Sequence, residues 1–264
     1  MAALTVRRAD FLMTLAYATD LATGHSRDFA LRSCVLAIRL AEVAGLNEQT
    51  RRNVYHQALL RYIGCNADTH LLASAFGDEI ALRRDLQKID IGNKPELVET
   101  ITRALMRTFV DLAPAELAKA VERGLGEAMQ VSVPILAGHC EVAMRIAERI
   151  GLSTEIRENL GQLYERWDGK GLPRGFAGDA VKLPVRLVTL AQDAIALAEA
   201  HGIETMTAMI AKRAGGDCDE PLAVHKFCSM LPAFTFEARP VVPVMDAVRV
   251  ELEAIAFRDE LKAK

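Results

Sequence analysis

Apolar residues recur every three or four positions along most of the chain, the spacing of helices that bury one face. No stretch alternates with the period of two that marks a half-buried strand. The sequence therefore predicts an all-α fold with an irregular region over residues 66–95. The expected helices cover residues 5–22, 26–44, 47–64, 96–110, 114–130, 134–150, 153–167, 184–201, 204–214 and 221–231.

Helix boundaries are marked by capping residues and glycines. Ser26, Asn47 and Ser153 each precede an apolar-periodic run and are predicted N-caps. Gly45 and Gly151 follow such runs and are predicted to end them.

The pattern divides the chain into three parts. Residues 1–231 are predicted to form one domain, and residues 232–243, with three prolines, a linker. Residues 244–264 follow as an amphipathic C-terminal helix whose heptad pattern covers about two repeats, too few for a stable coiled coil alone. This helix either packs on the domain or connects it to a partner subunit or a further domain.

Composition narrows the function classes. The 264 residues are 51% apolar, carry a net charge of −3 and have a pI near 6.1. This balance argues against direct nucleic-acid binding and against an anionic membrane surface. No apolar run approaches the ~20 residues that span a bilayer, and the first helix is amphipathic, unlike a signal peptide. The five scattered cysteines fit reduced thiols, so a cytoplasmic location is expected.

Four short segments carry the candidate chemistry. The most distinctive, residues 164–173, contains the single Trp of the chain between a predicted helix and a glycine-proline turn. The other three lie near the ends of predicted helices and precede it along the chain. The four segments are Gly24-His25-Ser26, residues 58–64 (ALLRYIG), residues 139–147 (HCEVAMRIA) and residues 165–173 (ERWDGKGLP).

Together these segments resemble the HD-GYP domain, the cyclic-di-GMP phosphodiesterase branch of the HD phosphohydrolase superfamily. The resemblance covers roughly residues 16–231 and implies an HD-domain helical bundle. The chain is also similar to the N-terminal domain of bacterial regulators that combine HD domains with a LuxR-type DNA-binding module. Active members of the family hold two or three divalent metals, iron, manganese or similar, through His and Asp side chains, and the metals activate water.

This sequence departs from the family at most metal-site positions. Two histidines match, and the defining His-Asp pair is replaced by an Arg-Tyr pair, although Arg has no lone pair to offer a metal. Asp193 lies one residue, ~100° of helix rotation, from the late metal-ligand position. The degenerate positions are His25, Arg61, Tyr62, Cys65, His139, Leu163, Tyr164 and Gln192, with His25 and His139 the only metal candidates.

The glycine-proline turn keeps residues of the family's signature, although most of the metal-ligand positions are replaced by other residues. Its retained residues are Glu165, Trp167, Asp168, Gly169, Gly171 and Pro173. Two interpretations stand: a structural fold marker, which is favoured, or a retained ligand pocket. His25 and His139 are either structural histidines or a residual metal or anion site.

Arg61 has two interpretations as well. It replaces the positive charge of the metals and keeps a phosphate-friendly pocket, or it pairs with a nearby acid such as Glu165 or Asp168.

The preferred hypothesis is a catalytically inactive HD-GYP-like regulatory domain. It would act by forming a homodimer, by binding a larger regulator or partner, or by binding a nucleotide, with no cofactor and no membrane contact. The alternative is a divergent metal-dependent phosphohydrolase that uses ligands such as His25, His139, Asp68, His70 or Asp193. A purely structural scaffold is the third possibility.

Overall fold

The fold consists of helices throughout residues 7–212, the part of the chain that the computed structural model describes. The all-α prediction is confirmed for these residues. The helices are α1 (Arg8–Thr23), α2 (Phe29–Val43), α3 (Glu48–Leu60), α4 (Thr69–Phe76), α5 (Glu79–Leu86), α6 (Lys94–Thr108), α7 (Pro114–Arg149), α8 (Thr154–Leu160), α9 (Leu183–His201) and α10 (Ile203–Lys212), with a short 3-10 helix at Gly178–Ala180.

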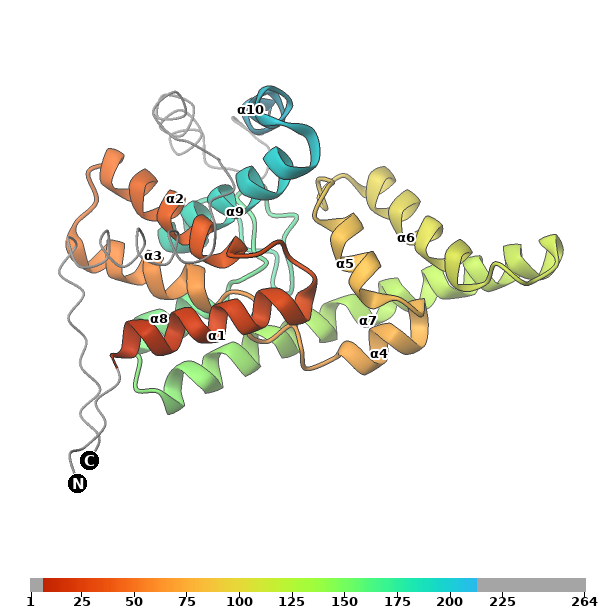
Figure 1. Ribbon diagram of the computed structural model, residues 1–264, viewed down its shortest axis with the longest axis horizontal. Helices are drawn as coiled ribbons and strands as arrows, with labels where there is room; N and C mark the ends of the chain where they lie inside the picture. Colours follow the sequence, from red (N-terminus) through yellow and green to blue (C-terminus); the bar gives the residue numbers. More distant parts are fainter. Residues whose placement is uncertain (1–6, 213–264) are drawn as a thin grey trace.

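The helices form a wide body and a narrower arm, joined by α7 (Figure 1). The body contains α1, α2, α3, α8, α9, α10 and the C-terminal half of α7. The arm contains α4, α5, α6 and the N-terminal half of α7. Each part has its own apolar core, and the loop between α8 and α9 lies where the two parts meet (Figure 1).

The body core is built around α2 and α9, which pack against each other and against α3. Apolar side chains of α2 such as Leu36 and Leu40 are fully buried, as are Val188, Leu190 and Ala191 of α9. Full burial of a Val or Leu side chain stabilises the fold by roughly 1.5–3 kcal/mol. Because α2 and α9 are apolar on most sides, they form the rigid frame on which the ends of α3 and α7 are positioned.

Helix α7 is continuous over 36 residues, whereas the sequence predicted two helices separated near Pro134. A proline inside a helix removes one backbone hydrogen bond and destabilises the helix by ~3 kcal/mol. Both flanks of Pro134 are anchored by tertiary packing: Leu125 and Ala128 contact the arm core, and Cys140 and Ala143 lie in the body core. This packing outweighs the local effect of the proline, so the predicted break is wrong.

Other boundaries also differ from the sequence prediction. The region 66–95, expected to be irregular, contains α4 and α5, which close the arm core through Phe76 and Leu82. Helix α8 ends at Leu160 instead of Trp167, and a series of turns follows it. Ser26 is not an N-cap; Asp28 precedes α2, and the Ser26 hydroxyl donates a hydrogen bond to Glu199 of α9.

Two predicted caps are confirmed by hydrogen bonds. The Asn47 side chain accepts a hydrogen bond from the backbone N–H of Thr50, and the Ser153 hydroxyl accepts one from Ile156. The predicted helix over residues 221–231, the linker and the C-terminal helix lie outside the described residues. None of the helices within residues 7–212 combines the length and apolarity that crossing a bilayer requires.

Candidate functional site

The site begins with a close approach between the end of α3 and the middle of α7. A Cβ atom on Gly64 would lie less than 3.0 Å from the backbone carbonyl of His139, so only glycine fits at this position. The contact places the turn after α3, with Cys65 and Asp68, beside the His139 side chain. Two segments that are 71 residues apart in sequence are thereby joined at one point.

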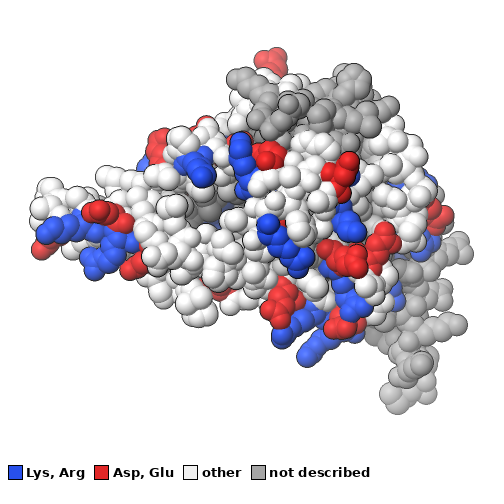
Figure 2. Space-filling model, turned by 180° about the vertical axis from the view of Figure 1, so that it is seen from behind, with Lys and Arg blue, Asp and Glu red and all other residues white. Residues whose placement is uncertain are grey.

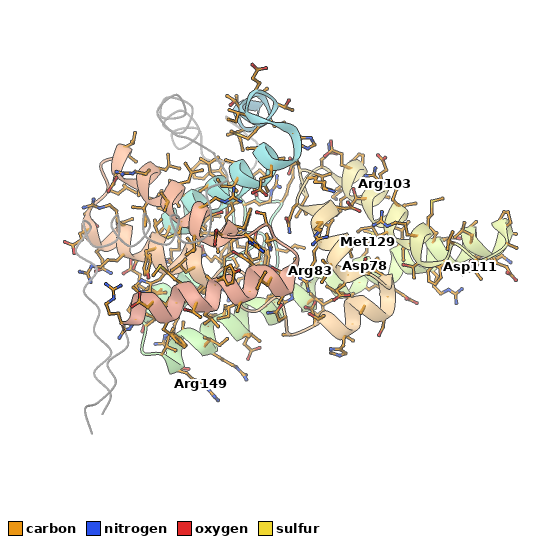
Figure 3. The ribbon with its side chains drawn as sticks, in the orientation of Figure 1. Asp78, Arg83, Arg103, Asp111, Met129 and Arg149 are labelled. Carbon is orange, nitrogen blue, oxygen red and sulfur yellow. The ribbon has the colours of Figure 1, made fainter. Side chains whose placement is uncertain are left out.

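His139 lies at the centre of a hydrogen-bond network. Its Nε2 is 2.8 Å from Asp68 Oδ1, and its Nδ1 is 2.9 Å from the Tyr164 hydroxyl. That hydroxyl is also 3.1 Å from Cys65 Sγ. Arg83 of α5 donates a hydrogen bond to the Cys65 carbonyl at 2.7 Å and lies 3.5 Å from Asp68 Oδ1. Figure 3 shows Arg83 at the junction of arm and body, where it ties α5 to the site.

The network keeps His139 protonated. Burial alone would lower the pKa of His139, but the Asp68 carboxylate and the neighbouring Cys65 sulfur raise it to about 9. Burial would raise the pKa of Asp68, yet His139 and Arg83 hold it below its usual value. At neutral pH the imidazolium therefore donates both N–H groups, one to Asp68 and one to Tyr164, and keeps no lone pair for a metal.

Replacing His139 by Gln is expected to remove a pH-dependent part of the stability. The folded-state pKa of about 9 lies above the ordinary value of 6.5, so the stabilisation is complete below pH 6.5 and is lost as pH rises through 9. We expect the difference in Tm between the wild type and His139→Gln to be large at pH 6.5 and to shrink by pH 9.5. Thermal unfolding followed by circular dichroism across this range measures it; a constant difference would contradict the protonation assignment.

Arg61 lies at the C-terminal end of α3 with its side chain directed inward and only 7% of the residue exposed. Its guanidinium donates a hydrogen bond to the Thr189 hydroxyl at 3.1 Å. The guanidinium carbon lies 5.9 Å from the ring centres of both Tyr62 and Tyr164. Among residues 7–212 no carboxylate forms an ion pair with Arg61.

The expected alternative partners of Arg61 are occupied elsewhere. Both carboxylate oxygens of Glu165 accept backbone hydrogen bonds at 2.8 Å, from Arg174 and Phe176. Asp168 forms an ion pair with Arg166 at 2.8 Å and accepts a hydrogen bond from the Lys170 backbone. The interpretation that Arg61 pairs with one of these two acids is therefore wrong.

His25 packs against the ring of Tyr62. Its ring centre is 4.4 Å from those of Phe29 and Tyr62, and its Nδ1 is 2.6 Å from the Thr23 hydroxyl. Burial, together with the charges of Arg83 and Arg61, lowers the pKa of His25 to about 4, so the ring is neutral at pH 7. Its Nε2 is buried and has no hydrogen-bond partner in the described part of the chain.

The remaining predicted positions differ in role. Gln192 of α9 is 1% exposed, and neither its amide oxygen nor its amide nitrogen has a partner within residues 7–212. Leu163 is fully buried in the apolar core and takes no part in the polar network. The degenerate positions other than Leu163 and Gln192 are linked by contacts around one polar region, but His25 and His139 are separated by the side chains of Tyr62, Arg61 and Tyr164.

The turn after α8 is held by its own hydrogen bonds. Glu165 binds the backbone on the far side of the loop, and a Cβ on Gly171 would collide with the backbone of residues 164–166. Gly169 has φ of 75°, a conformation that favours glycine. The Arg186 guanidinium lies over the Trp167 ring, 4.9 Å from its centre. The turn in this way fixes Tyr164 beside His139.

Residues 101–214 match the family model described as HD domain. These residues resemble an HD domain, and they make up less than half of the chain. The matched range includes His139, the turn over residues 165–173 and Gln192, while His25 and Arg61 precede it.

A curated protein and a solved structure, both from Vibrio cholerae, are similar to this chain. The 3'3'-cGAMP-specific phosphodiesterase 3 is 20% identical over 208 residues, which are 78% of this chain and 44% of that protein. The crystal structure of the cyclic GMP-AMP-specific phosphodiesterase V-cGAP3 matches with a TM-score of 0.62 and 15% identity, over 98% of this chain and 57% of that one. The chain spans about half the length of these relatives. The structural likeness shows a shared fold, and the predicted resemblance is confirmed.

The metal centre that the HD-GYP resemblance implies does not fit the residues present. Within residues 7–212 no three His, Cys, Asp or Glu side chains are placed to hold one metal ion. Both nitrogens of His139 are engaged, and one nitrogen of His25 is bonded to Thr23. The Arg61 guanidinium, a permanent cation, lies between these two histidines. The set of donors needed for iron or manganese is thus absent from residues 7–212.

Sequence reasoning missed three residues that shape the site. Thr23 and Thr189 are ordinary hydroxyl residues inside helices, and nothing in the sequence marks them as partners of His25 and Arg61. Arg83 was missed because α5 lies in the region expected to be irregular. Asp68 was considered as an alternative metal ligand, and the structure instead places it against His139.

Proposed function

We propose that this chain is a catalytically inactive HD domain that serves signalling, by dimerisation or by binding a partner or a nucleotide. The observation that carries the proposal is the pair of cations at the degenerate site, Arg61 and protonated His139. HD-family hydrolysis depends on metals that activate a water molecule. The permanent charge of Arg61 disfavours a divalent metal, and both ring nitrogens of His139 are engaged by Asp68 and Tyr164.

The relationship to phosphodiesterases suggests which ligands to test first. One relative is named for its specificity for 3'3'-cGAMP, and a regulatory domain related to such an enzyme could bind a cyclic dinucleotide without cleaving it. We expect no hydrolysis of 3'3'-cGAMP or cyclic-di-GMP above the enzyme-free rate when the purified chain is supplied with Mn²⁺, Fe²⁺ or Mg²⁺. Chromatography of the reaction products measures this.

A divergent phosphohydrolase remains the second candidate, and the contact between His139 and Asp68 favours it. An imidazole and a carboxylate 2.8 Å apart are two of the side chains a metal would need. His70 is exposed on α4 and has no place in the network. Metal-dependent turnover that disappears in both His139→Ala and Asp68→Asn, and persists in the surface control Arg145→Met, would establish this candidate and overturn the first.

A further inference from the structure

Arg61 is a buried charge that lacks a counter-ion among the described residues. A buried, unpaired charge costs several kcal/mol, and burial of a guanidinium is normally accompanied by a carboxylate or phosphate. The Thr189 hydroxyl satisfies one N–H group, and the two tyrosine rings contribute roughly 0.5–2 kcal/mol by cation–π attraction. These contacts fall short of compensation, and the Nε group of Arg61 has no partner in the described region.

Two further polar side chains beside Arg61 are also unsatisfied. Gln57 lies one turn before Arg61 on α3 and is 0% exposed, and Gln192 lies one turn after Thr189 on α9. Neither amide has a hydrogen-bond partner within residues 7–212. Helices α3 and α9 pack against each other, and the Arg61–Thr189 bond joins them. Most buried polar groups in proteins are hydrogen-bonded, so a cluster of unsatisfied groups is a place where a bound molecule would complete the hydrogen bonds.

The charges around this cluster favour an anion. The positive charges of Arg61 and Arg83 both act on His25, so two cations lie near this site. Asp68 is neutralised by His139 and Arg83, and Asp193 is the acid whose charge acts on the neighbouring Tyr62. On the face that Figure 2 shows, the surface is hollowed where the arm meets the body, and both Lys/Arg and Asp/Glu side chains lie around the hollow.

We propose that Arg61, together with Gln57, Thr189 and Gln192, binds one phosphate group, free or as part of a nucleotide. The guanidinium supplies the charge that metals supply in an active HD-GYP site, and the amide and hydroxyl groups complete the hydrogen bonds. This inference rests on the proposed function, because a metal ion and a phosphate held by Arg61 would compete for the same space.

The test is thermal unfolding of the chelator-treated full chain against inorganic phosphate, GMP and 3'3'-cGAMP, at constant ionic strength. We expect the Tm of the wild type to rise with ligand concentration, as binding to the folded state requires. A response to all three probes identifies the phosphate group as the ligand, and a response to 3'3'-cGAMP alone identifies the dinucleotide; both support the site. No response of the wild type to any probe would overturn the proposal and leave buried water as the partner.

Two variants and a matched control assign the effect to the site. Arg61→Met should weaken the binding of the responding probe by about tenfold or more, and should not lower Tm without ligand, since it removes an unpaired charge. Gln192→Leu should weaken binding as well, and it keeps the test decisive if Arg61→Met fails to fold. Arg145→Met, in an exposed ion pair with Glu141, should respond as the wild type does. An unchanged response in Arg61→Met, or in Gln192→Leu where Arg61→Met does not fold, would overturn the assignment.

The metal content of the untreated protein separates this inference from the proposed function. Stoichiometric bound metal would contradict the proposed function. If the protein is metal-free and its Tm does not change with any phosphate probe, the anion site alone is overturned.

Discussion

Gly64→Ala is expected to lower the free energy of unfolding by about 3 kcal/mol or more. The added methyl group would meet the backbone carbonyl of His139, which cannot rotate away as a flexible side chain can. Either α3 and α7 move apart, or the turn that carries Cys65 and Asp68 shifts. Urea unfolding followed by circular dichroism measures the change.

Gly138→Ala is the matched control, one residue from His139 on α7. A Cβ at this position would meet no atom within 4 Å, and alanine favours a helix over glycine by about 0.8–1 kcal/mol. The control variant should therefore be slightly more stable than the wild type. If Gly64→Ala were as stable as Gly138→Ala, the close contact between the two segments would be absent from the protein.

Glu165→Gln should be the second strongly destabilising change, with a loss of about 3–5 kcal/mol in the free energy of unfolding. The Glu165 carboxylate is 1% exposed, and each of its oxygens accepts one backbone N–H from the loop over residues 174–176. Glutamine keeps one acceptor but turns a donor toward the other N–H, so two buried donors face each other. The loss should be visible as a lower urea midpoint.

Glu158→Gln provides the comparison for this prediction. Glu158 is exposed on α8 and lies 3.7 Å from Lys182 in a surface ion pair, which contributes little. Its Tm and urea midpoint should stay close to those of the wild type. Equal stability of Glu165→Gln and Glu158→Gln would mean that Glu165 does not hold the turn.

The sequence predicted the helices whose apolar spacing is regular and missed those decided by tertiary contacts. Helices α2, α3 and α9 carry clear apolar faces, and their positions follow from that pattern. Pro134 misled the prediction because its local effect is outweighed by packing on both sides, a contribution that the local pattern does not contain. The short helices α4 and α5 were missed for the same reason, since each is stabilised mainly by the arm core.

The site was only partly predictable. The degenerate positions were located through motif order, and the structure brings His25, Arg61 and Tyr164 among others around one polar region. What could not be predicted was which side chains contact each of them: Asp68 and Tyr164 contact His139, and Thr189, Tyr62 and Tyr164 contact Arg61. These contacts join residues far apart in sequence, and no spacing rule along the chain specifies them.

The central claim is that cations have replaced the metal centre in this HD domain. Its most direct test is the metal content of the full chain, purified without chelator from cells supplied with iron and manganese and measured by inductively coupled plasma mass spectrometry. We predict far less than one iron, manganese or zinc ion per chain, with no difference between the wild type and His139→Ala. One or more metal ions per wild-type chain, lost in His139→Ala, would contradict the claim.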